Sequence, residues 1–73
     1  MLEVTLSEHA QTKLQILARH GFTIRQADVL DAVVTPDHVE EGYLGRKIAQ
    51  KLLTETHVLR VVYEEGAQGI VVV

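Results

Sequence analysis

Four cationic side chains fall within one short stretch of the chain and are the residues best suited to do chemistry: Arg46, Lys47, Lys51 and Arg60. Glu55 is the only acidic residue between positions 46 and 60. Such cations can bind the phosphates of a nucleic-acid backbone and stabilise the negative charge that develops when RNA is cleaved. The pattern therefore predicts a nucleic-acid-binding surface. Lysine and arginine on an exposed strand also discourage unwanted pairing, so a solvated strand face is the alternative interpretation.

Histidine is the other residue type that can act as acid or base near neutral pH. His57 lies close to the cations in the sequence and, together with Arg60, is a candidate catalytic residue. His9 and His20 lie too far apart along one expected helix to share a metal ion. No other spacing of histidine or acidic residues predicts a metal site, and no glycine-rich phosphate loop predicts a cofactor.

The composition limits the class of protein. Seventy-three residues, of which 47% are hydrophobic, predict a single domain over 1–73. The absence of cysteine excludes disulfides and cysteine-based zinc sites. A formal net charge of −3 opposes nonspecific attraction to nucleic acid, and three aromatic residues leave few rings for stacking bases. The sequence shows no signal peptide and no apolar run of about 18 residues, so we expect a cytoplasmic protein with no membrane partner.

The hydrophobic pattern predicts an α+β fold, in which a short strand and a two-helix hairpin precede a three- to four-stranded antiparallel sheet. Ser7 reads as the N-cap of the first helix and Gly21 as its C-terminal stop. Thr23 and Gln26 fit a capping box for the second helix, which Pro36 ends. The strands are expected at 2–6, 39–43, 47–53, 56–64 and 70–73.

The pairing of the 47–53 and 56–64 strands decides which cations meet, because directly opposed side chains share a face of the sheet. A connecting loop of even length places Lys47, Lys51 and Arg60 together on the face away from the helices. An odd loop or a bulge would invert this relation. With an even loop, the face covered by the helices carries five apolar or aromatic residues: Ile48, Leu52, Leu59, Val61 and Tyr63.

The last strand, 70–73, is apolar on both faces and contains no lysine or proline that would protect an exposed edge. We therefore expect this strand to lie inside the sheet or to be covered by another subunit. A small domain gains apolar burial from a second copy, which makes a symmetric homo-oligomer the expected form of such a contact.

Several local motifs together resemble those of a family of small bacterial proteins. They are Ser7-Glu8-His9-Ala10, Arg19-His20-Gly21, Thr35-Pro36-Asp37, Gly45-Arg46 and Leu59-Arg60-Val61-Val62-Tyr63. The chain resembles the domain-of-unknown-function 4258 family, which is similar in fold to the RelE and ParE toxins of toxin–antitoxin systems. The residues that match recurrent family positions are His9, Arg46 and Arg60.

The resemblance implies several functions, between which the fold does not choose. RelE-like members are endoribonucleases that cleave messenger RNA on the ribosome, whereas ParE-like members poison gyrase. A toxin would have an antitoxin protein, and RNA or the ribosome, as partners. The expected functions are therefore an RNA-acting toxin or a diverged relative without catalysis, and the alternative is a noncatalytic protein-interaction or homo-oligomeric module.

Overall fold

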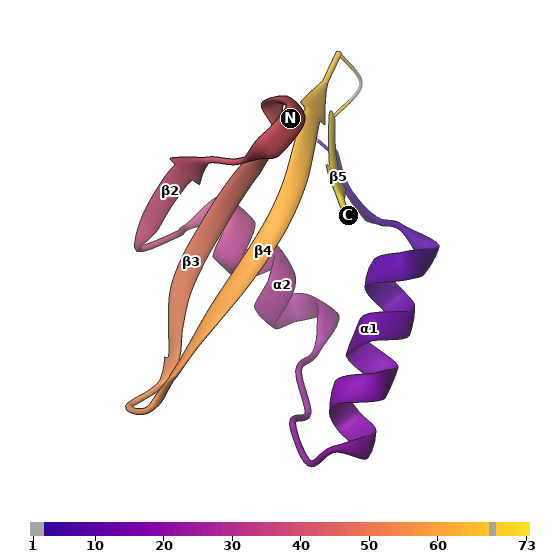
Figure 1. Ribbon diagram of the computed structural model, residues 1–73, viewed down its shortest axis with the longest axis vertical. Coiled ribbons are helices and arrows are strands. Elements are labelled where there is room, and N and C mark those ends of the chain that lie inside the picture. Colours follow the sequence, from indigo (N-terminus) through magenta and orange to yellow (C-terminus); the bar gives the residue numbers. More distant parts are fainter. Residues whose placement is uncertain (1–2, 68) are drawn as a thin grey trace.

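The computed structural model describes residues 3–67 and 69–73, and it has the α+β class that the sequence predicts. Leu2, with which the expected first strand begins, lies outside the described residues. The described elements, drawn in Figure 1, are β1 (Glu3–Leu6), α1 (Glu8–Arg19), α2 (Gln26–Val34), β2 (His38–Glu41), the short 3-10 turn η1 (Tyr43–Gly45), β3 (Lys47–Thr54), β4 (His57–Gly66) and β5 (Gly69–Val72).

All five strands form one sheet in the order β1-β5-β4-β3-β2. The strands β2 to β5 form the expected antiparallel part, and β1 adds a fifth strand that runs parallel to β5. The prediction that the last strand lies inside the sheet is confirmed, since β5 lies between β1 and β4 and Val72 is only 4% exposed. Burial of β5 by its own chain removes the reason for expecting a subunit contact there.

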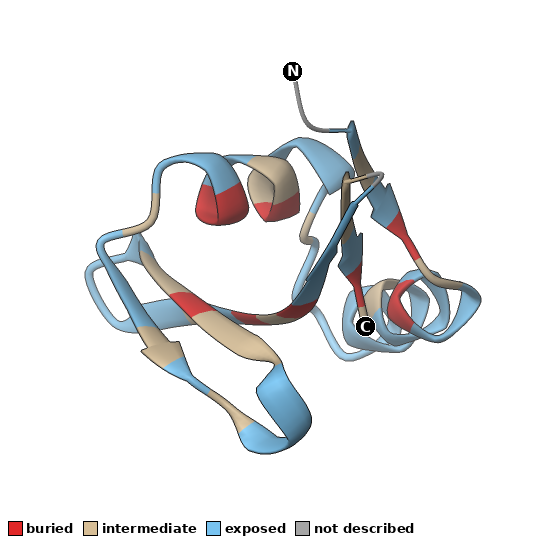
Figure 2. Cartoon of the chain, turned by 90° about the horizontal axis from the view of Figure 1, so that it is seen from above, coloured by how far each residue is buried: buried red, intermediate tan, exposed pale blue. Residues whose placement is uncertain are grey.

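The hydrophobic core lies between the sheet and the helices, as the buried segments in Figure 2 show. Ala32 of α2 and Ala49 of β3 are both fully buried, and side chains this small let the helix pack closely on the strand. The complete core is Leu6, Ala10, Val29, Ala32, Val33, Ala49, Val61, Tyr63 and Val72. Within the described residues, no helix is long and apolar enough to cross a membrane.

The two helices differ in how well their first turns were predicted. The Ser7 hydroxyl caps α1, because its Oγ accepts a hydrogen bond from the Ala10 backbone N–H at 3.1 Å. The capping prediction for Thr23 is wrong, because α2 begins at Gln26. The Asp28 carboxylate accepts a hydrogen bond from the Arg25 backbone N–H at 2.9 Å instead. A carboxylate is a strong acceptor and is favoured at the positive end of a helix dipole, so Asp28 fixes the start of α2.

A bulge in the β3–β4 hairpin sets the register of the sheet. Thr54 lies opposite His57 across the two-residue turn, but Leu52 lies opposite Val58, so Leu53 is the extra residue. One added residue reverses the faces of everything beyond it on that strand. The even-loop expectation therefore holds only for the pair next to the turn, Thr54 and His57. From Leu52 back to Lys47, each β3 side chain lies on the face opposite to the one expected.

Candidate nucleic-acid interface

The bulge at Leu53 separates the predicted cations. Lys47 and Lys51 lie opposite Tyr63 and Leu59, on the face that the helices cover, whereas Arg60 lies opposite Gln50 on the other face. The prediction that Lys47, Lys51 and Arg60 share a face is therefore wrong. The same inversion places Ile48 and Leu52 on the open face of the sheet, although the sequence predicted both on the face covered by the helices.

Lys51 is engaged in holding β3 to the end of α2. Its Nζ donates hydrogen bonds to the Thr35 carbonyl at 3.0 Å and to Thr35 Oγ1 at 2.9 Å, and it lies 2.7 Å from Asp31 Oδ2. An ammonium has three donors, so this group has none left for a phosphate. Hydrogen bonds from Lys51 and then from Thr35 lower the pKa of Asp31, because both stabilise the carboxylate. A cation at the negative end of a helix is also favoured by the helix dipole.

The other three cations also have carboxylate partners. Arg46 Nε lies 2.8 Å from Glu64 Oε1, Lys47 Nζ lies 3.2 Å from Glu65 Oε1, and Arg60 Nη2 lies 3.0 Å from Glu40 Oε1. The hydrogen bond to Glu65 raises the pKa of Lys47, because it stabilises the charged ammonium. Each of the four predicted nucleic-acid-binding residues is thus neutralised locally by an acidic side chain.

The sequence interpretation missed the roles of Glu40, Glu64 and Glu65, although one signal was present. If β3 and β4 paired without a bulge from the two-residue turn Glu55–Thr56, Lys51 would lie directly opposite Arg60. Like charges in opposed positions destabilise a sheet. The bulged register avoids this repulsion, because it places Lys51 opposite Leu59 and Arg60 opposite Gln50.

The two candidate catalytic residues lie on opposite faces of β4. His57 and Arg60 are separated by an odd number of positions, so their side chains point to opposite sides of the strand. His57 Nδ1 lies 2.9 Å from Thr56 Oγ1 and 3.2 Å from Thr54 Oγ1, and its ring packs against Phe22 with the centroids 5.4 Å apart. His57 therefore joins the hairpin tip to the connection between the helices.

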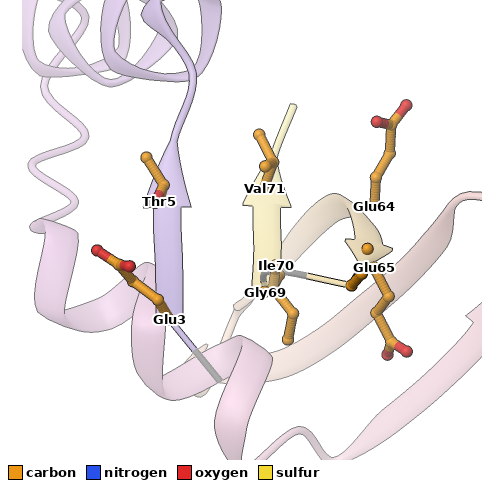
Figure 3. Close-up of a pocket in the computed structure, with 9 residues that line it drawn as sticks. Glu3, Thr5, Glu64, Glu65, Gly69, Ile70 and Val71 are labelled. Atoms are coloured by element: carbon orange, nitrogen blue, oxygen red, sulfur yellow. The ribbon is translucent and has the colours of Figure 1, made fainter. Parts of the chain in front are cut away.

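A hollow of about 530 Å³ lies at the far end of the sheet from the β3–β4 hairpin tip. Its acidic lining residues are Glu3, Glu64 and Glu65. Figure 3 shows Glu64 and Glu65 leaving β4 in opposite directions and Glu3 pointing away from both. Among the residues that the structure describes, no group of three or more His, Cys, Asp or Glu side chains could hold a metal ion.

A second cavity, of about 120 Å³, separates α1 from β4 and is mostly apolar. We call it the α1–β4 groove and define it by Leu14 and Leu17 of α1 and by Leu59 and Val61 of β4. The apolar spacing of Ala10, Leu14 and Leu17 predicts that one face of the first helix packs in the core. The structure confirms this for Ala10, which is buried, and for Leu14, which is half-buried against the core, whereas Leu17 lines the cavity and is 37% exposed.

Comparison with known proteins gives no match: no family model, no curated protein and no solved structure matches this chain.

Proposed function

We propose that this protein is a noncatalytic protein-interaction module, a diverged relative of the toxin-like domains that the chain resembles. The observation that carries the proposal is that each of the four candidate cations pairs with a carboxylate, at distances of 2.7 to 3.2 Å. Binding RNA would require these pairs to open. Such exchange gains little, because nucleic-acid affinity comes mainly from cations that are free to neutralise phosphates.

The η1 turn supports a protein partner. Tyr43 is 84% exposed and Leu44 is 76% exposed, although both are large and apolar. Leu44 also has a φ of 59°, a left-handed conformation that costs a non-glycine residue about 1–2 kcal/mol. Aromatic residues are enriched in protein–protein interfaces, and strained backbone is concentrated at functional sites. An exposed Tyr-Leu pair on a strained turn thus suits contact with another protein.

The proposal is tested by measuring the affinity of the protein for single-stranded RNA with fluorescence anisotropy at physiological salt. We expect the wild type to bind with a Kd weaker than about 10⁻⁴ M, the weak end of nonspecific nucleic-acid binding. The comparison is a triple variant, Glu40→Gln, Glu64→Gln and Glu65→Gln, which changes the formal net charge from −3 to 0 and frees three cations.

The triple variant should bind RNA more tightly than the wild type, with an affinity that falls as salt is added. It should also stay folded, because each exposed ion pair contributes only about 0–1 kcal/mol to stability. Micromolar RNA binding by the wild type, lost in Arg46→Gln and Arg60→Gln, would contradict the proposal. Cleavage of messenger RNA on ribosomes by the wild type would contradict it directly and favour the RNA-acting toxin.

A further inference from the structure

The open face of the sheet, which points away from the helices, presents a band of apolar side chains. On this face Ile48 lies opposite Val62, and Leu52 lies opposite Val58. Leu52 is 60% exposed and Val58 is 57% exposed. Both helices pack against the core on the other face, where Figure 2 shows the buried segments. A contiguous apolar band on an open sheet face is typical of a surface that binds another protein.

The accessible surface of this chain is larger than its mass predicts. Folded monomeric proteins of 8.1 kDa expose about 4,500 Å². This chain exposes 5432 Å². The difference of about 900 Å² is close to the roughly 800 Å² that each partner contributes to a protein–protein interface of standard size. The surplus surface is therefore as large as the area that one copy of the chain would bury in a stable dimer.

The arginines and glutamates on the open face of β2, β3 and β4 form closed pairs of opposite charge. Arg60 Nη2 lies 3.0 Å from Glu40 Oε1, and Arg46 Nε, directly before β3, lies 2.8 Å from Glu64 Oε1. A two-fold contact brings a surface against a copy of itself, so a face with one sign of charge would repel its copy. A face with balanced pairs meets its copy without this repulsion, whereas a strongly acidic or basic partner gains nothing from it.

We propose that the open face binds the open face of a second copy of this chain about a two-fold axis, through Ile48, Leu52, Val58 and Val62. This inference rests on the proposed function as a protein-interaction module and names the partner that the module binds. Two sheets that pack face to face lie about 10 Å apart, with their strands within about 30° of each other. The apolar side chains of both copies fill this space, and exclusion of water from them supplies the free energy of association.

The ion pair of Arg60 and Glu40 determines how the two copies are oriented. In a two-fold contact, a residue that meets a second residue is met by it in return. An axis that passes between these two side chains brings Arg60 of each copy to Glu40 of the other. The pair within each copy does not have to open, because a guanidinium has five N–H donors and Glu40 Oε1 accepts its hydrogen bond from Nη2. Each copy thus complements the charge of the other.

Sedimentation velocity tests the contact. Because interfaces of this size have dissociation constants of about 1 μM or lower, the wild type should sediment as a dimer at about 100 μM. Val58→Lys places an ammonium between the two apolar layers and should weaken self-association at least about tenfold, because the charge there loses water. Val34→Lys is the matched control, since Val34 is 68% exposed and ends α2, which packs on the other face of the sheet. The control should dimerise as the wild type does.

An exchange of charges tests the orientation. Arg60→Glu gives each copy two acidic side chains at the axis and Glu40→Arg gives two cationic ones, so each variant alone should self-associate at least about tenfold more weakly than the wild type. An equimolar mixture should associate more tightly than either variant alone, because the acidic side chains of one copy then face the cationic ones of the other. Arg19→Glu, which makes the same change in net charge at the exposed end of α1, is the control and should dimerise as the wild type does. All variants should stay folded in urea titrations, since exposed side chains contribute little to stability.

Three results would overturn the inference. A monomeric wild type at about 100 μM would leave the open face to a different protein. Equal dimerisation of Val58→Lys and Val34→Lys would place the contact on another surface. A mixture of Arg60→Glu and Glu40→Arg that associates no better than the separate variants would contradict the two-fold arrangement. Each result is separate from a failure of the proposed function, which would appear as RNA binding by the wild type whether or not it dimerises.

Discussion

Gly69→Ala should be among the most destabilising single substitutions in the chain, because Gly69 lies where β5 meets both β1 and β4. Its φ is 141°, a conformation adopted almost only by glycine, and a Cβ atom there would collide with the carbonyl oxygen of Glu3. Glu3 is the residue paired with Gly69 at the start of β1. The methyl group therefore both strains β5 and pushes β1 away from the sheet.

The magnitude follows from these two effects. Backbone strain at such a position costs about 1–3 kcal/mol. Displacing β1 loosens Leu6, a buried core residue whose burial contributes up to about 1.5–3 kcal/mol. We therefore expect Gly69→Ala to lower the free energy of unfolding by about 1–6 kcal/mol, from backbone strain alone to strain plus full loss of the Leu6 burial. A domain of this length has a total stability of about 4–11 kcal/mol, so the loss is a large part of it.

Urea denaturation followed by far-ultraviolet circular dichroism measures this loss, and Gly66→Ala is the matched control. Gly66 pairs with Gly69 in the β4–β5 hairpin, but its φ is not in the left-handed region and the nearest atom to an added Cβ lies 3.8 Å away. The control should stay within about 1 kcal/mol of the wild type. A Gly69→Ala cost no larger than that of Gly66→Ala would show that β1 does not pair with β5 as described.

Three further predictions concern the helices and the η1 turn. Asp28→Ala should cost about 0.5–2 kcal/mol in the same urea assay because it removes the cap of α2, whereas Thr23→Ala should change stability little. The wild type should be more stable than Asp31→Asn at neutral pH, because the Asp31 carboxylate pairs with Lys51. Protonation ends this pairing, so the difference in stability should disappear as the pH falls through the lowered pKa of Asp31. Thermal unfolding of both proteins between about pH 2 and pH 7 measures this difference. Leu44→Gly should stabilise the protein by about 0.5–1 kcal/mol, because glycine adopts the left-handed conformation of this residue without strain. This gain exceeds the cost of the greater conformational freedom that glycine gives the unfolded chain. Unchanged or lower stability would mean that the turn is not strained.

The order of the elements could be predicted because its signals are local. Ser7 and Gly21 bound α1, and Pro36 follows α2, each through the conformation of one or two residues. The start of α2 was predicted wrongly because two acceptors, the Thr23 hydroxyl and the Asp28 carboxylate, were available within a few residues. The local sequence therefore predicted that the first turn of α2 is capped, but not which of these two acceptors caps it.

The candidate site could not be predicted, because it depends on a register that no local signal fixes. Leu53 is the bulged residue, yet nothing distinguishes it from Leu52 in the sequence. The ion pair of Arg46 with Glu64 joins residues eighteen positions apart, so no local pattern predicts it. The sequence could have favoured the bulged register only by comparing the cross-strand charge pairs of each possible register, because a register that places Lys51 opposite Arg60 is destabilised by their like charges.

The bulge also determines which side chains the open face of the sheet presents. Because it turns β3 over, Leu52 and Val58 become opposed neighbours on the open face, where they are 60% and 57% exposed. Arg60 lies beside Val58 on the same face and is neutralised by Glu40. An apolar pair beside a closed ion pair repels neither acidic nor basic partners, and it gains free energy when water is excluded. The even register would have placed three cations on that face, which would suit phosphates. A single inserted residue thus replaces three cations on this face with an exposed apolar pair beside a closed ion pair, which is the arrangement that the proposed protein-interaction role requires.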